Sequence, residues 1–556
     1  MEGYNLIKVF EKTIQDHWDL EAFSDYELST STYKQVGENI LKLHSLFEAC
    51  NIKKGDKIAL IGKNSTQWCI TYLATITYGA TIVPILADFP QENIQNIINH
   101  SDAKLLFADE AIYKKVDTTF FQNLKCIFDL KDFSILYTFF ECQFEKDFQT
   151  ISKDFIKEHG NGILKDNFVL PKIDDKNLGV ISYTSGTTGF SKGVMLPLSS
   201  LMANIHFAWN NMPLKANDKM LSILPLAHAY GCAFEFLWPF ATGVHVTFLG
   251  KLVSPKIMIQ AFQQIKPRLI LMVPLIIEKI YKKQILPILS KPSMQILLRI
   301  PIINRVIHKK IYDKLSAVFG GNFREVVIGG AALNGTVEQF LRKIGFNYSV
   351  GYGMTECGPL ISYANWDKTA LGSCGSVVDK LEINIDSPDS ENIPGEILVK
   401  GTHVMTGYYK NKEETDKVID ENGWLHTGDL GVIDKVGFIH IKGRSKCLIL
   451  GPSGENIYPE EIESKLSTYP YVSEQLVISD NNKLVALIFP DLEKSEKDGL
   501  QIEELVYLLE NTKQEVNKTL PKYAQISKIE IQSKQFEKTP KQSIMRFKYE
   551  TIKKNN

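Results

Sequence analysis

Hydrophobic and polar positions follow two different periods along the first 170 residues of the chain. Apolar side chains between residues 33 and 50 recur with the helical period, whereas residues 57–61 and 104–108 are short apolar runs of strand length. Residues 178–182 predict another strand of this kind. Strands that alternate with helices indicate an α/β fold with parallel-rich sheets.

The segment from Asn64 to Ala87 carries no charged side chain. It is long enough to suggest a membrane span, but it contains several threonines and is interrupted by Gly79 and Pro84. We therefore expect a buried helix, a turn and a strand.

Three later patterns place candidate elements. Ser199 and Ser200 are predicted to cap a helix over residues 201–211. A strand that begins at Leu221 is predicted to end at Pro225 and to deliver His228 into a loop beside aromatic residues. Residues 325–328 predict a strand that leads into two glycines, where a flat ring can pack on the backbone.

Composition and charge narrow the class of protein. The 556 residues are 44% hydrophobic and 23% charged, which is ordinary for globular domains, and this length predicts more than one domain. A net charge of −1 offers no global field for nucleic acid. The eight cysteines form no CxxC pair, and the first residues lack the pattern of a signal peptide. We therefore expect a cytoplasmic protein without structural disulfides or zinc.

The candidate chemistry begins at Tyr183-Thr184-Ser185-Gly186-Thr187-Thr188-Gly189-Phe190-Ser191-Lys192-Gly193. Glycines allow the backbone to approach a ligand closely, and exposed N–H groups and hydroxyls suit an anion. The lysine adds a positive charge for phosphate oxygens. The spacing differs from the Walker pattern, so we expect a phosphate-binding loop of another type.

Two further strings suit a nucleotide. In Gly351-Tyr352-Gly353-Met354-Thr355-Glu356, the tyrosine can stack on adenine, the threonine can donate to a phosphate, and the glutamate can bind Mg²⁺ through oxygen. In Gly423-Trp424-Leu425-His426-Thr427-Gly428-Asp429, an acid follows a tight turn. A carboxylate in such a place can accept ribose hydroxyls.

These strings together resemble the adenylate-forming (AMP-binding) superfamily, and the chain is most similar to its long-chain fatty acyl-CoA synthetases. The resemblance spans roughly residues 20–550. It implies a large multi-layer N-terminal region (residues 1–442) that binds AMP and the acyl group, a hinge at 443–446, and a small, mobile α+β C-terminal domain (447–556). The string from Gly451 to Glu463 is similar to the loop that lines the thiol tunnel of the family.

The resemblance also implies roles for individual residues. Mg²⁺ would be held by Thr184 and Glu356. The catalytic residues would be Thr184, Lys192, His228, Thr355, Glu356 and Lys541. The nucleotide would be bound by Thr184, Ser185, Gly186, Thr187, Thr188, Gly189, Lys192, Gly330, Ala331, Tyr352, Gly353, Thr355, Asp429, Arg444 and Lys446.

The chain departs from the family in two places. Its usual motif Pro-Lys-Thr-x-x-Gly-Lys ends in a lysine that bridges carboxylate and α-phosphate, but this position is Ser543 here, and Lys541 is the nearest substitute. Cys447 replaces an acid after Lys446.

The implied reaction is the activation of a fatty acid by ATP to an acyl-adenylate, followed by transfer to coenzyme A. Peptide-synthetase relatives need an aspartate near His228, and the first acid here is Glu235, which counts against an amino-acid substrate. A carrier protein as acceptor, a short-chain or aromatic acid, and a low-turnover acyl-adenylate-binding protein stay open as alternatives.

Residues 279–314 form the strongly biased region of the chain. They carry nine basic side chains and one acid, with apolar residues between them. This pattern suits either a solvated helical face or a segment that rests on the inner face of an anionic membrane. A long-chain acid could be collected there.

Overall fold

The computed structural model describes seven stretches of the chain. They are residues 5–139, 146–160, 162–184, 191–250, 255–451, 454–539 and 544–552. The predicted α/β class is confirmed, because helices and parallel-rich sheets alternate along most of this length. Within these stretches, every helix is too short or too polar to span a bilayer.

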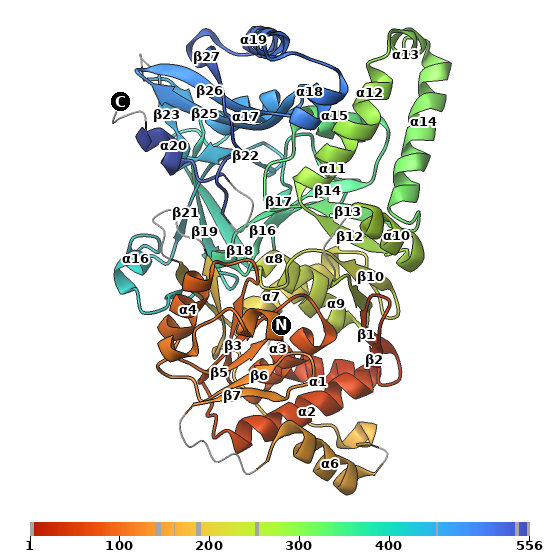
Figure 1. Cartoon of the computed structure of the whole chain (residues 1–556), viewed down its shortest axis with the longest axis vertical. Coiled ribbons are helices and arrows are strands. Elements are labelled where there is room, and N and C mark those ends of the chain that lie inside the picture. The colour runs from red at the N-terminus through yellow and green to blue at the C-terminus, as the bar shows by residue number, and fades with distance from the viewer. Residues whose placement is uncertain are drawn as a thin grey trace.

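An eight-stranded sheet forms the lower part of Figure 1, in the order β20-β9-β8-β4-β3-β5-β6-β7. Neighbours from β8 to β6 run parallel, whereas β9, β20 and β7 pair antiparallel. Its strands are β3 Lys57–Ile61, β4 Thr81–Ile85, β5 Ala103–Ala108, β6 Cys126–Asp129, β7 Ile135–Thr138, β8 Leu178–Thr184, β9 Lys192–Pro197 and β20 Gly407–Tyr408.

Both faces of this sheet are buried, as parallel strands require. Ile58 and Leu60 of β3 join one hydrophobic cluster, whereas Ala59 and Ile61 point into another. The helices of this region are α1 Leu6–Asp16, α2 Tyr33–Ala49, α3 Thr66–Tyr78, α4 Gln91–His100, α5 Glu110–Tyr113, α6 Phe148–His159 and α7 Leu198–Asn211, with short 3₁₀ turns η1 Thr118–Phe120 and η2 Lys165–Asn167.

The uncharged segment forms the predicted helix, turn and strand. Ser65 accepts a hydrogen bond from the N–H of Trp68 at the start of α3, and Gly79 ends the helix with φ +91° before β4 begins. The cap predicted at Ser199 and Ser200 is wrong. Helix α7 begins at Leu198, and Ser200 is buried and donates to the carbonyl of His403, so its hydroxyl serves a tertiary contact.

The middle of the chain builds two further sheets. One has the order β10-β11-β1-β2 and the other β12-β13-β14, which is parallel. The strands are β1 Glu21–Asp25, β2 Thr30–Thr32, β10 Lys219–Ser222, β11 His245–Phe248, β12 Leu269–Met272, β13 Glu325–Ile328 and β14 Tyr348–Val350. The helices are α8 Ala229–Gly231, the π-helix η3 Cys232–Leu237, α9 Trp238–Thr242, α10 Pro255–Ile265, α11 Pro274–Ile280, the π-helix η4 Tyr281–Ile285, α12 Leu286–Leu289, α13 Pro292–Leu297, α14 Pro301–Val318 and α15 Gly335–Lys343.

Two antiparallel sheets connect this region to the C-terminal part. Their orders are β15-β16-β17 and β18-β19-β21-β22. The elements are β15 Tyr352–Gly353, the 3₁₀ turn η5 Thr355–Cys357, β16 Leu360–Tyr363, β17 Ser376–Val377, β18 Leu381–Asp386, β19 Gly395–Gly401, α16 Lys412–Asp416, β21 Leu425–Ile433 and β22 Ile439–Arg444.

The C-terminal residues have hydrophobic clusters of their own and lie at the top of Figure 1. Their main sheet has the order β25-β26-β27. The elements are the 3₁₀ turn η6 Ser445–Cys447, β23 Ile449–Leu450, β24 Asn456–Ile457, α17 Pro459–Ser467, β25 Val472–Asp480, β26 Lys483–Pro490, α18 Leu492–Lys497, α19 Ile502–Lys518, η7 Lys522–Ala524, β27 Ile526–Ile531 and α20 Phe547–Ile552. The boundaries at 442 and 447, the hinge between them and the mobility of this part stay predictions.

Candidate functional site

Three of the predicted nucleotide residues are joined by direct contacts. Asp429 of β21 is register partner of Arg444 at the end of β22, and the Nε atom of Arg444 lies 3.0 Å from its Oδ1. The hydroxyl of Tyr352 donates to the other carboxylate oxygen at 2.8 Å. Burial raises the pKa of Asp429, while Arg444 and Tyr352 oppose this shift. The carboxylate is therefore fixed on both oxygens.

The backbone of β21 just before Asp429 explains its position, since Gly428 there has φ +72°. The hydroxyl of Thr427 donates to the carbonyl of Ile397 at 2.8 Å and accepts the N–H of Asp429 at 3.1 Å. Glu396 accepts the N–H of Gly428 at 2.8 Å. The side chains of Thr427 and of Glu396 from β19 thus hold the backbone that presents the carboxylate.

Glu356, the predicted Mg²⁺ ligand, lies in the 3₁₀ turn η5 beside half-buried Thr355. Its Oε1 accepts a hydrogen bond of 2.9 Å from the hydroxyl of Tyr408. Burial, together with this nearby carboxylate, raises the pKa of Tyr408. Gly353 permits the close turn, because a Cβ there would lie 2.1 Å from the carbonyl oxygen of Pro359.

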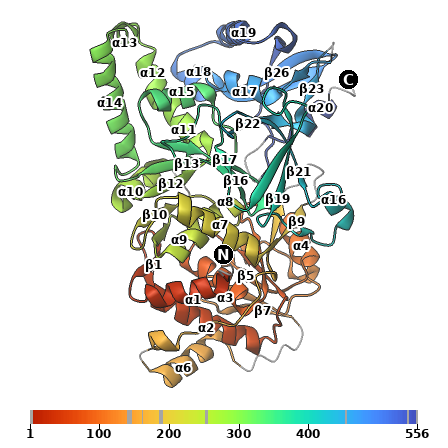
Figure 2. The same cartoon turned by 180° about the vertical axis from the view of Figure 1, so that it is seen from behind.

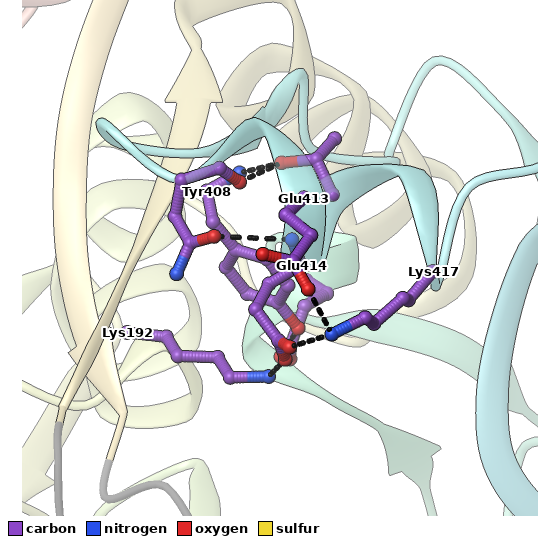
Figure 3. A network of polar contacts seen from close by, with 8 residues as sticks. Lys192, Tyr408, Glu413, Glu414 and Lys417 are labelled. Atoms are coloured by element: carbon purple, nitrogen blue, oxygen red, sulfur yellow. Dashed lines mark hydrogen bonds and ion pairs between the residues drawn. The ribbon is translucent and has the colours of Figure 1, made fainter.

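Tyr408 also meets Lys192, the predicted phosphate lysine. The Nζ atom of Lys192 lies 4.9 Å from the centre of the Tyr408 ring and pairs with the carboxylate of Glu414 (Figure 3). Glu414 also pairs with Lys417 at 2.8 Å, and these two lysines lower its pKa to about 2. One tyrosine ring thus connects the predicted phosphate lysine with the predicted metal ligand.

The phosphate loop itself joins β8 to β9. Thr184 and Lys192 are register partners at the open end of this antiparallel pair, so the two residues that flank the loop lie opposite each other. The loop residues Ser185, Gly186, Thr187, Thr188 and Gly189 lie outside the described residues, as does Lys541.

His228 is half-buried at the N-cap position of α8, in a loop that two side chains hold. Oε2 of the fully buried Glu235 accepts from the Ser222 hydroxyl and from the N–H groups of Ile223 and Leu224, at 2.9, 3.0 and 2.9 Å. In addition, Nδ2 of Asn64 donates to the Leu224 carbonyl at 2.7 Å, and its Oδ1 accepts the N–H of Leu226 at 3.0 Å. The backbone that leads to His228 is therefore clamped by two side chains.

The remaining predicted residues, Gly330, Ala331 and Lys446, have no recorded contact with these groups among the described residues. Gly330 and Ala331 are exposed where β13 ends, and Tyr352 follows the neighbouring parallel strand β14. Gly330 has φ +87°, a conformation that favours glycine. Lys446 is exposed in η6, two residues after Arg444.

A small apolar cavity of about 20 Å³ lies between the His228 loop and the Glu356 motif. Ala227 and Ala229 line it from one side and Gly358 from another. This volume holds about one water molecule, whereas ligand pockets are typically about 300–1,000 Å³. An acyl chain does not fit this cavity as it stands.

Tyr408, Glu414, Asn64 and Glu235 were not predicted as site residues. Glu235 had a signal in the sequence, since it is a lone charge in the apolar run 232–238. The other three are ordinary polar residues whose partners lie far away in sequence.

Mg²⁺ fits the donors present. Carboxylate and hydroxyl oxygens are its preferred ligands, and it commonly uses one or two carboxylates together with substrate phosphates and water. Glu356 offers such a carboxylate, and no group of three or more His, Cys, Asp or Glu suited to a metal occurs among the described residues. A site completed by a nucleotide matches this sparse donor set.

Two family profiles match the chain. One, described as "AMP-binding enzyme", covers residues 10–409, and the other, "AMP-binding enzyme C-terminal domain", covers residues 447–553.

Similar proteins include "Long-chain-fatty-acid--CoA ligase FadD15" of Mycobacterium bovis, 27% identical over 472 residues, or 80% of this chain and 74% of that protein. "Long-chain-fatty-acid--[acyl-carrier-protein] ligase AEE15, chloroplastic" of Arabidopsis thaliana is 27% identical over 545 residues, or 84% of this chain and 73% of that protein.

Solved structures share the fold. The ATP-bound RpMatB-BxBclM chimera B1 has a TM-score of 0.77 at 21% identity and 99% coverage of both chains. O-succinylbenzoate coenzyme A synthetase (MenE) from Bacillus subtilis, in complex with ATP and magnesium ion, has a TM-score of 0.74 at 20% identity and 98% coverage of both.

Proposed function

Because the chain belongs to the AMP-binding enzyme family, we propose that it is an acid–thiol ligase that activates a long-chain fatty acid with ATP and transfers the acyl group to coenzyme A. The observation that carries the proposal is the contact of Tyr352, Asp429 and Arg444. It fixes a buried carboxylate beside an aromatic ring, an arrangement that suits a ribose next to a stacked adenine.

In the first step, a carboxylate oxygen of the acid attacks the α-phosphorus of ATP. The bond from this phosphorus to the bridging oxygen breaks, pyrophosphate leaves, and an acyl-adenylate forms. Two anions must approach each other, so the site must supply positive charge and donors. Lys192 and Thr355 supply them, together with Thr184 and the loop residues 185–189. Glu356 and Thr184 would hold Mg²⁺, which neutralises phosphate charge when bound.

Ser543 stands at the position where the family has its catalytic lysine, and Lys541 is proposed to take over the role of that lysine. It would supply a cation to the carboxylate and the α-phosphate during adenylation. Its neighbours in sequence are held in the C-terminal part, where Lys538 pairs with Glu474 at 2.7 Å.

In the second step, the thiol sulfur attacks the acyl carbon. The bond from this carbon to the phosphate oxygen breaks, AMP leaves, and the thiol proton passes to solvent. The acceptor brings the nucleophile, so the chain needs none of its own. His228 is proposed to border the reacting carboxyl, held there by Asn64 and Glu235.

The acid is proposed to be long-chain for two reasons. Residues 273–281 resemble the corresponding stretch of long-chain acyl-CoA synthetases, and a basic segment with interleaved apolar residues follows them. A cytoplasmic location with peripheral contact to the inner face of an anionic membrane, through residues 279–314, belongs to the same proposal, since long-chain acids partition into bilayers. An acyl-carrier protein is the second candidate acceptor, and the similarity to a relative named for that acceptor favours it.

Pyrophosphate release from ATP and Mg²⁺ tests the proposal, with acids from acetate to oleate and either coenzyme A or acyl-carrier protein. We expect release that depends on a long-chain acid and an acyl-CoA product. Asp429→Ala should lose most of this release, whereas Asp386→Ala, an exposed acid on β18, should retain it. If pyrophosphate release stops at one equivalent per enzyme with coenzyme A but continues with the acyl-carrier protein, the carrier protein is the acceptor. ATP binding without release with any acid would refute the ligase and favour a low-turnover binding protein.

A further inference from the structure

Helices α12, α13 and α14 form a hairpin along one edge of the molecule, with α13 at its far end (Figures 1 and 2). Large aliphatic side chains are exposed around this end, among them Ile296 at 62% and Ile302 at 78%. The others are Ile288, Leu297, Ile300 and Val306. We call residues 288–306 the tip surface. Clusters of exposed aliphatic side chains on a protein surface mark sites of contact with another protein or with a membrane.

Basic side chains surround these aliphatic groups. Lys291, Arg299 and Arg305 lie within the tip surface and are exposed, and Lys309 and Lys310 follow about one helical turn later. None of these five side chains forms an ion pair with another described residue, and the one acid on α14, Asp313, follows Lys309 and Lys310 beyond the tip surface. The tip surface is therefore apolar and carries uncompensated positive charge.

The C-terminal part covers the base of the hairpin but leaves the tip bare. Lys282 of η4 donates to the carbonyl oxygens of Ser467 at 3.2 Å and of Val472, and Lys283 lies 3.9 Å from Glu493 of α18. Lys282 thus differs from the rest of the basic segment, because its charge is directed into a contact between the two parts of the chain. Contacts within the chain therefore account for the basic side chains at the base of the hairpin, but not for the exposed aliphatic and basic side chains of the tip surface.

We propose that the tip surface binds a bilayer that contains anionic lipid. Its aliphatic side chains would enter the boundary between headgroups and acyl chains, while Lys291, Arg299 and Arg305 contact lipid phosphates. Protein interfaces are enriched in aromatic residues, and residues 288–306 contain none. Aliphatic groups mixed with bases favour lipid as the occupant.

Membrane binding as such is independent of the ligase activity. Its use is not, since delivery of a membrane-dissolved fatty acid to the site rests on the function proposed above. The test therefore measures binding and activity separately.

Co-sedimentation with vesicles measures the binding. We expect the full chain to bind vesicles of phosphatidylcholine with phosphatidylserine, to bind pure phosphatidylcholine at least about tenfold more weakly, and to be released by salt. The double variant Ile296→Ser/Ile302→Ser and the triple variant Lys291→Gln/Arg299→Gln/Arg305→Gln should each weaken binding about tenfold or more. Thermal unfolding should be unchanged, because these side chains are exposed.

The matched control lies on α19, where Ile502 and Tyr507 are 71% and 67% exposed but Glu503 and Glu504 lie beside them. Ile502→Ser/Tyr507→Ser should bind vesicles as the wild type does. The proposal is overturned if the wild type ignores anionic vesicles, if the tip variants still bind, or if the control loses binding equally. Pyrophosphate release with a long-chain acid presented on albumin, without vesicles, should be the same in the wild type and the tip variants, so that a failed ligase and a failed membrane contact give different results.

Discussion

Substitution of Glu235 tests whether the clamp on the His228 loop controls the site. Glu235→Ala removes the acceptor of the Ile223 and Leu224 N–H groups. A buried donor left without an acceptor costs about 1–3 kcal/mol, so two of them together cost about 2–6 kcal/mol before the new cavity is counted. Glu235→Gln is the matched variant, since its amide oxygen can replace Oε2.

The assay combines urea unfolding with steady-state pyrophosphate release. For Glu235→Ala we expect a clearly lower unfolding midpoint and a kcat reduced about tenfold or more, because His228 is no longer held. Glu235→Gln should retain most stability and activity. Equal midpoints and equal kcat values for the two variants would refute the clamp.

The same carboxyl predicts a pH dependence. Burial raises the pKa of Glu235 from 4.5 to about 8, and its Oε1, which has no partner among the described residues, can carry the proton while Oε2 still accepts. Between these pH values the folded state holds a proton that the unfolded state releases. The wild type should therefore lose stability relative to Glu235→Gln as pH rises through this window, by at most about 1.4 kcal/mol per pH unit. A wild type that gains stability relative to Glu235→Gln as pH rises, or a stability difference between the two that stays constant, would contradict this origin of the pKa shift.

Three further substitutions address the other contacts. Tyr352→Phe keeps the ring but removes the hydrogen bond to Asp429. This variant should raise the KM for ATP about tenfold and leave the KM for the acid unchanged. Equal increases in both KM values would refute the proposed contact of Asp429 with the ribose. Glu414→Gln removes the carboxylate that pairs with Lys192 and would compete with a phosphate for it. The KM for ATP should fall about two- to fivefold, a small effect because this partly exposed ion pair is weak. A higher KM for ATP would count against the competition. Lys282→Met should make the C-terminal part more sensitive to limited proteolysis, whereas the exposed Lys283→Met should not.

Local patterns predicted local structure well. The segment 64–87 could be assigned because its lack of charge, its glycine and its proline act within a few residues, and α3, Gly79 and β4 follow that pattern. The cap at Ser200 was predicted wrongly because a tertiary acceptor, the carbonyl of His403, takes the hydroxyl. Propensity is overridden where a buried polar group finds a distant partner.

The same limit applies to the site. The strings around Tyr352, Glu356 and Asp429 could be found because their residue types suit a nucleotide locally. Tyr408 and Glu414 could not, since their partners Glu356 and Lys192 lie 52 and 222 residues away. The pairing of β20 with β9 and the hydrogen bond from the N–H of Met405 to the carbonyl of Glu356 bring these segments together. Long-range pairing of this kind leaves no trace in a local pattern.

The pairing of β21 with β22 links the nucleotide contact to the predicted hinge. Arg444 reaches Asp429 because the two are register partners, and the predicted hinge at 443–446 includes Arg444 itself. A rotation at this point turns the backbone that carries the guanidinium, so the ion pair with Asp429 must break or follow the motion. Asp429 itself is held from the other side by Thr427 and Tyr352, which do not belong to the hinge. If the proposed hinge turns between the two proposed steps, the carboxylate should keep its place, and the contribution of Arg444 should differ between the steps.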